Sequence, residues 1–115
     1  SRLLPKDVAA ADVQATLTEF TASSIIGSID RFCPGTQEIY ICGGGANNQL
    51  LMSRLARLAN GRPVRPTDDL GVPAGQVEAV AFAWLAMKCV RREPVDMTAV
   101  TGARHPCVMG AIYPA

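Results

Sequence analysis

The chain has 115 residues and a formal net charge of +1, and 49% of its residues are hydrophobic while 18% are charged. This length is enough for one domain with a core, and this composition excludes a disordered tail. The near-neutral balance gives no electrostatic footprint for nucleic acid, and no apolar run reaches the about 20 residues of a membrane helix. We therefore expect neither nucleic acid nor a membrane as a partner.

The first predicted element is a helix over residues 13–32, where no proline intervenes. Asp7 or Asp12 is a candidate N-cap for this helix. Its apolar residues fall on two sides of the helix at helical spacing. One side has Val13, Leu17 and Phe20, and the other has Ala22, Ile25, Ile26 and Ile29. A helix that is apolar on two sides usually packs against other elements on both sides. In this chain alone, we expect one of the two sides to be exposed or to contact a second copy of the chain.

A strand, a glycine turn and a helix start follow the break at residues 33–36. The apolar run 38–42 predicts the strand, Gly43, Gly44 and Gly45 form the turn, and a helical pattern begins at Leu50. Glycines let backbone N–H groups approach a ligand, and a helix start offers unsatisfied donors and the positive end of its dipole. The stretch is therefore either a phosphate or anion site or a turn that merely needs tight packing.

The helix from Leu50 is expected to end at Asn60-Gly61, and residues 62–66, with two prolines, predict an edge strand. The polar turn 67–71 contains Asp68 and Asp69. Paired carboxylates can hold a metal or act as acid and base, but aspartate is so common in turns that a turn role is favoured.

A third helix is predicted over residues 74–90. It is apolar nearly all round, a pattern typical of a helix buried in a larger fold. Glu78 is the only charged residue between Val72 and Lys88. Its functional interpretation is a ligand contact, for example to a sugar hydroxyl. The alternative is a structural role, either in an ion pair or on a solvent-exposed stripe of the helix, and composition alone favours this structural role. Residues 108–113 predict a strand or a docked extension.

The order helix, strand, helix, strand, helix indicates an α/β fold with a mainly parallel sheet flanked by helices. The glycine turn then lies at the carboxyl edge of the sheet, where ligands of such folds bind. Few residues of the sequence are candidates for catalysis. No C-x-x-C pair, Ser/His/Asp set or G-x-x-x-x-G-K-[ST] loop is present, no metal site is expected, and the cysteines are interpreted as mostly buried, reduced thiols. A possible phosphate site without a recognisable catalytic base is what one half of a two-domain active site would contain.

The chain resembles the C-terminal part of the anhydro-N-acetylmuramic acid kinases. Five blocks in the order of that family cover nearly the whole chain, and they are residues 12–22, 40–55, 67–71, 77–86 and the ending 101–103 with 109–114. The resemblance implies a three-layer ribonuclease-H-like fold of the sugar kinase, Hsp70 and actin superfamily. It also implies that residues 1–115 are a single C-terminal nucleotide-binding subdomain, a fragment of a two-domain kinase with ATP in the cleft.

The family opens the 1,6-anhydro ring with water while phosphorylating the sugar, which gives N-acetylmuramic acid 6-phosphate in bacterial cytoplasmic cell-wall recycling. The resemblance therefore implies ATP and Mg²⁺ as cofactors, an anhydro-amino-sugar substrate and a missing N-terminal domain as partner. Gly43, Gly44, Gly45 and Asn48 match its nucleotide-binding turn, and Glu78 matches a carboxylate near the sugar. Asn47 stands where the family often has a basic residue.

The catalytic base and the phosphate loop of this family belong to its N-terminal half, so we expect no catalytic residue in this chain and no activity of the chain alone. A surface that a missing half would cover tends to self-associate, so a homodimer is expected. Two alternatives stay open. One is a non-catalytic chaperone-like or assembly module on the same fold, and the less favoured one is a dinucleotide-binding domain, because G-G-G-A-N-N lacks the G-x-G-x-x-G order.

Overall fold

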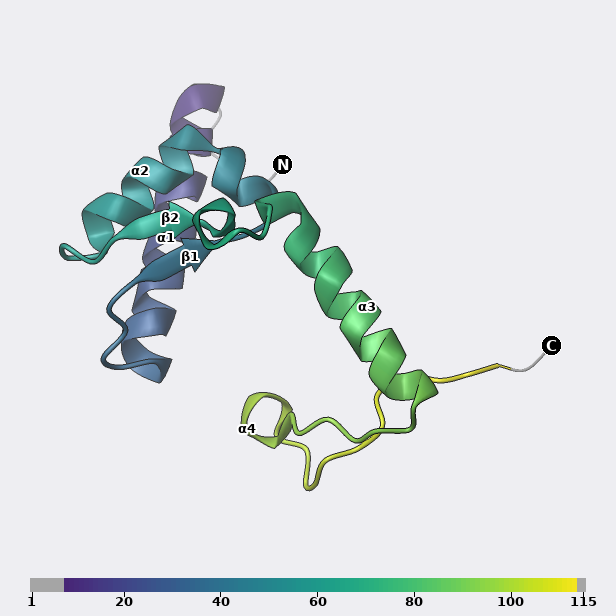
Figure 1. Cartoon of the computed structure of the whole chain (residues 1–115). Coiled ribbons are helices and arrows are strands. Elements are labelled where there is room, and N and C mark those ends of the chain that lie inside the picture. Colours follow the sequence, from purple (N-terminus) through teal and green to yellow (C-terminus); the bar gives the residue numbers. More distant parts are fainter. Residues whose placement is uncertain (1–7, 114–115) are drawn as a thin grey trace. The chain divides into compact units, whose positions relative to one another are not determined.

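The computed structural model describes residues 8–113, and the chain divides into two units, Ser1–Gly75 and Gln76–Ala115 (Figure 1). The first unit contains α1 (Ala10–Phe32), β1 (Ile39–Ile41), α2 (Gln49–Leu58) and β2 (Val64–Pro66). The second unit contains α3 (Val77–Val90) and the short α4 (Thr98–Thr101). A short 3-10 turn, η1 (Gly44–Asn47), lies between β1 and α2. Two more, η2 (Thr67–Leu70) and η3 (Ala74–Gln76), lie between β2 and α3 in the sequence.

The helix α1 is buried on only one of its two apolar sides. Ala22 and Ile26 face the core, whereas Leu17 is 58% and Phe20 70% exposed, as expected for a helix apolar on two sides. The expected cap is wrong at Asp12, because Ala9 occupies the N-cap position without a side-chain hydrogen bond and Asp12 lies inside the first turn. Asp7 lies outside the described residues.

The two strands pair in parallel, with Ile39 opposite Val64 and Ile41 opposite Pro66. Leu55 and Ala59 at the end of α2 meet Ile39 and the buried side of α1 in one core cluster. Arg54 and Arg57 of α2 form ion pairs with Glu19 of α1, and Arg62 pairs with Asp30 at 2.8 Å. This strand–helix–strand unit confirms the predicted α/β class and the parallel pairing, while the three-layer arrangement stays a prediction.

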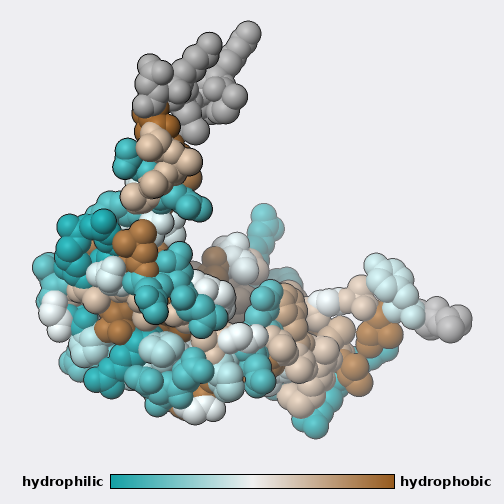
Figure 2. Space-filling view, turned by 90° about the horizontal axis from the view of Figure 1, so that it is seen from above, coloured by the Kyte–Doolittle hydropathy of each residue, from teal (hydrophilic) through white to brown (hydrophobic). Residues whose placement is uncertain are grey.

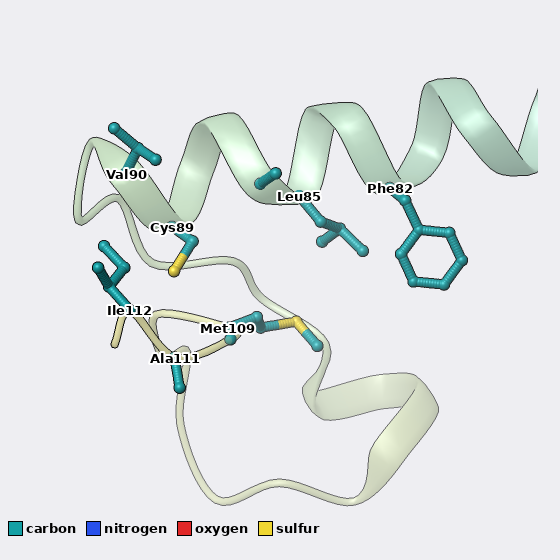
Figure 3. A pocket seen from close by; sticks show the side chains of 9 residues that line it. Phe82, Leu85, Cys89, Val90, Met109, Ala111 and Ile112 are labelled. Carbon is teal, nitrogen blue, oxygen red and sulfur yellow. The ribbon is translucent and has the colours of Figure 1, made fainter. Parts of the chain in front are cut away.

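In the second unit, α3 contains no buried residue, and apolar side chains such as Val80 and Phe82 are 58% and 63% exposed. Figure 2 shows an apolar surface gathered over this helix. The segment 108–113 is not a strand. It is a docked extension whose Met109, Ala111 and Ile112 lie along α3 beside Cys89 (Figure 3). One antiparallel bridge, between Val95 and Cys107, closes the loop before it.

Two further expectations concern cysteines and membranes. The interpretation of mostly buried thiols is wrong: Cys33, Cys42 and Cys107 are exposed and Cys89 is half-buried. Cys42 is exposed because β1 ends at Ile41, so the residue belongs to the turn and not to the core strand. Within residues 8–113, no helix is both long and apolar enough to cross a membrane.

Candidate functional site

The glycine turn begins where β1 ends, and its first residue holds the turn in place. Gly43 has φ 74° and ψ −171°, a conformation that is essentially restricted to glycine. Its N–H donates to the carbonyl oxygen of Ala74 at 2.8 Å. The expectation that all three glycine amides are available to a ligand is therefore wrong at Gly43, because a carbonyl of the chain itself already satisfies that donor.

The next two amides are different. Gly44 and Gly45 open η1, and neither N–H donates to any residue that the structure describes. The first N–H groups of a helical turn have no partner within it, which leaves them available to an anion. A Cβ built on Gly44 would meet nothing within 4 Å, so the space beside this residue is open. Among the described residues, Gly44 therefore presents an unpaired donor beside open space, and Gly45 presents a second one at a half-buried position.

Asn48 links the turn to α2. Its Oδ1 accepts a hydrogen bond from the Leu51 N–H at 3.1 Å, so the side chain is the N-cap of α2. Its own N–H donates to the carbonyl oxygen of Gly45 at 3.0 Å, which ties η1 to the helix start. Only the side-chain NH₂ remains for a ligand, because the amide oxygen is committed to the cap. Asn47 is exposed beside it.

Two of the carboxylates that the sequence singled out differ from each other in their hydrogen bonding. Asp68 Oδ2 accepts from the Ala74 N–H at 3.1 Å, which confirms its turn role. Glu78 is exposed in the first turn of α3, and it makes no hydrogen bond or ion pair among residues 8–113. No group of three His, Cys, Asp or Glu side chains in this described range is placed to hold a metal ion.

The groups with shifted pKa values are each bound to a residue between two and five positions away in the chain. The Tyr40 hydroxyl donates to Glu38 at 2.6 Å, and this hydrogen bond raises the pKa of Tyr40. Hydrogen bonds from Lys88 and from Thr98 lower the pKa of Glu93 and of Asp96, respectively. The chemistry of the turn itself is therefore that of hydrogen-bond donation to an anion.

Sequence reasoning missed the part that Ala74 plays at this site. Its carbonyl binds the Gly43 amide and its N–H binds Asp68, so the segment after β2 is clamped onto the turn after β1. Backbone groups of an alanine carry no signature of residue type, so no sequence signal marks this contact. Glu78 lies in the other unit, so its relation to the turn stays a prediction.

Comparison with known proteins gives a consistent result. The family model described as "Anhydro-N-acetylmuramic acid kinase" matches residues 2–115. A protein of that name from Ralstonia nicotianae is 54% identical over 104 residues, which are 90% of this chain and 27% of the relative. One from Bordetella pertussis is 53% identical over 104 residues, again 90% of this chain and 27% of the relative.

A more distant protein with the same name, from Chromobacterium violaceum, is 47% identical over 111 residues, which cover 96% of this chain and 30% of the relative. The similarity thus extends over nearly all of this chain. The chain, in turn, spans less than a third of the length of the relatives it matches.

Proposed function

The chain belongs to the anhydro-N-acetylmuramic acid kinase family, and we propose that it is the C-terminal part of such a kinase. In this proposal the complete protein uses ATP to hydrolyse and phosphorylate 1,6-anhydro-N-acetylmuramic acid, which gives N-acetylmuramic acid 6-phosphate. The reaction serves peptidoglycan recycling in the bacterial cytoplasm. Residues 1–115 are then one C-terminal nucleotide-binding subdomain of a two-domain, actin-like fold.

The observation that carries the proposal is the pair of free amides at Gly44 and Gly45. Backbone N–H groups at a turn that opens a helix bind phosphate by hydrogen bonding and by the positive end of the dipole. The Asn48 NH₂ lies one turn further on and can donate to the same nucleotide. Gly43 shapes the turn by its backbone conformation, and its amide serves Ala74 instead of the ligand.

The chemical step is assigned to groups outside this chain. Phosphoryl transfer depends on positioning and on charge neutralisation around the transferred phosphate. Among residues 8–113, no group of three His, Cys, Asp or Glu side chains is placed to hold a metal ion, and we assign no ligand of Mg²⁺ to this chain. We propose that Glu78 accepts hydrogen bonds from the sugar, and that the chain alone shows no turnover in a coupled ATPase or sugar-kinase assay.

The test compares Gly44→Ala with Gly27→Ala in the complete protein. Neither added Cβ meets an atom within 4 Å and neither glycine has a positive φ, so both variants should fold. The methyl group at Gly44 would enter the open space beside the free amides, so we expect a higher KM for ATP, whereas Gly27→Ala on the exposed side of α1 should leave it unchanged. Equal kinetics of the two variants would argue against the proposal.

We also propose a homodimer, because apolar side chains remain uncovered on both units. Phe20 of α1 is 70% exposed and Phe82 of α3 is 63% exposed. Exposed patches of this kind favour self-association. Light scattering of residues 1–115 should give twice the monomer mass, and a monomer mass at high concentration would count against the dimer.

A further inference from the structure

Asp68 begins a relay of two hydrogen bonds that ends at the glycine turn, and the whole relay lies within the first unit. Its Oδ2 accepts from the Ala74 N–H at 3.1 Å, and the Ala74 carbonyl oxygen accepts from the Gly43 N–H at 2.8 Å. Ala74 is only 7% exposed, so its N–H has little access to water, and an unpaired donor there would be costly. The position of the Ala74 carbonyl therefore depends on the Asp68 carboxylate.

The backbone of η2 holds Asp68 at the start of this relay. The Gly71 N–H donates to the carbonyl oxygen of Asp68 at 2.9 Å. The next N–H, that of Val72, donates to the carbonyl oxygen of Thr67 at 3.2 Å. Asp69 follows Asp68 in the same turn, but its side chain makes no hydrogen bond or ion pair among residues 8–113. Of these two adjacent carboxylates, Asp68 alone takes part in the relay.

The consequence for a ligand comes from the peptide unit that joins Gly43 to Gly44. The carbonyl oxygen of Gly43 accepts from the Ala46 N–H at 3.2 Å, so both backbone polar groups of Gly43 are bound within the chain. The Gly44 N–H lies in the same planar peptide unit as this carbonyl and points to its opposite side. The hydrogen bonds on either side of Gly43 therefore fix the direction of the free Gly44 donor, and one of them comes through Ala74.

We propose that Asp68 is a positioning residue for nucleotide binding, which acts through Ala74 to keep the Gly44 and Gly45 amides in the orientation that binds phosphate. This inference rests on the proposed function, because it needs a nucleotide at the glycine turn. The role requires an acceptor oxygen at position 68 but no negative charge, which distinguishes it from that of a metal ligand or a general base. Asp68 itself does not touch the nucleotide.

The experiment measures the kinetics of Asp68 variants of the complete protein. Asp68→Ala removes the acceptor, so the KM for ATP should rise about fivefold, the typical effect of one lost hydrogen bond. Contacts made equally in the bound substrate and in the transition state change KM and not kcat, so kcat and the KM for the sugar should stay within about twofold. Asp68→Asn keeps an acceptor oxygen without the charge and should restore the KM for ATP to within about twofold of the wild type.

Asp69→Ala is the matched control, since it removes the neighbouring carboxylate from the same turn, and it should keep every wild-type constant. Asp68→Ser is a second test of the relay. Serine suits turns, but its hydroxyl oxygen lies one bond closer to the backbone than Oδ2, so the KM for ATP should again rise. Asp68 is exposed, so these substitutions leave no cavity in the core, and circular dichroism at the assay temperature should match that of the wild type.

A purely structural role of Asp68 would give a different pattern. Loss of folded protein lowers the apparent kcat and leaves both KM values unchanged, whereas the relay predicts a change in the KM for ATP alone. The inference is overturned by a folded Asp68→Ala or Asp68→Ser variant with the wild-type KM for ATP. It is also overturned by an Asp68→Asn variant whose KM for ATP rises fivefold or more, or by a failure of both the alanine and the serine variant to fold.

These results separate the inference from the proposed function. Turnover of the anhydro-sugar by the wild type, together with an unchanged KM for ATP in the folded variants, defeats only the positioning role. No turnover of the sugar by the wild type with ATP defeats the proposed kinase, and the positioning role is rejected with it.

Discussion

The two units of the chain differ in how completely each covers its own apolar residues. In the first unit, Ala22, Leu55 and Ala59 are 0% exposed in a cluster that joins two helices and a strand. In the second unit, α3 contains no buried residue although it is apolar on nearly every side. Apolar burial is the dominant favourable term in folding, so the first unit can fix the geometry of its turn by itself. The second unit depends on further surface for its stability.

The largest expected effect is on core packing and tests this contrast directly. Leu55→Ala should lower the free energy of unfolding of the chain by about 3 kcal/mol, because it leaves a cavity in the first unit. Val80→Ala, at a site that is 58% exposed, should change it by less than about 0.5 kcal/mol. Urea denaturation of both variants gives the comparison, and similar losses would show that the two units are not packed as differently as described.

The second effect sharpens the comparison within the turn. Gly43→Ala should cost about 2 kcal/mol, because an alanine at φ 74° and ψ −171° is strained. Gly44→Ala should cost less than about 0.5 kcal/mol, since its φ is not positive and its Cβ meets no atom. Thermal unfolding of the two variants separates a glycine that shapes the fold from one that keeps a surface open. Equal destabilisation would remove that distinction.

A smaller effect concerns the ion pairs that join α1 and α2. Glu19 lies 3.4 Å from Arg54 and also binds Arg57, and its side chain is 36% exposed. Glu19→Gln should therefore cost at most about 1 kcal/mol, and less at high salt, where exposed pairs are screened. Glu78→Gln is the control in the second unit, since Glu78 has no ion pair among the described residues, and it should not change stability at either salt concentration.

The smallest effect is a titration in the second unit. The hydrogen bond from Lys88 holds the pKa of Glu93 below its usual 4.5. A carboxyl whose folded pKa is depressed stabilises the fold above its unfolded pKa, and this contribution is lost as pH falls from about 4.5 through the folded value. In an NMR titration, Lys88→Met should move the Glu93 midpoint up toward 4.5 and leave Asp96, which is held low by Thr98, in place. An unmoved Glu93 midpoint would contradict this.

The sequence predicted those features of the fold that depend on local pattern. The β-branched run before Gly43 and the leucine spacing after Asn48 predicted β1 and α2, and the parallel pairing followed from their alternation. The η1 turn between them was not predicted, since its start depends on backbone angles at Gly43. The contact of Gly43 with Ala74 joins two backbone groups far apart in the chain, so residue types do not encode it. The burial expected for α3 requires surface beyond its own unit.

The central claim is that the amides of Gly44 and Gly45 bind the phosphates of a nucleotide. The most direct measurement is ¹⁵N–¹H NMR of the complete protein, labelled at glycine, with and without saturating ATP. The account predicts that the Gly44 and Gly45 signals move strongly, while those of Gly27 in α1 and Gly61 after α2 do not. Saturation with ATP that leaves the Gly44 and Gly45 signals unmoved would contradict it.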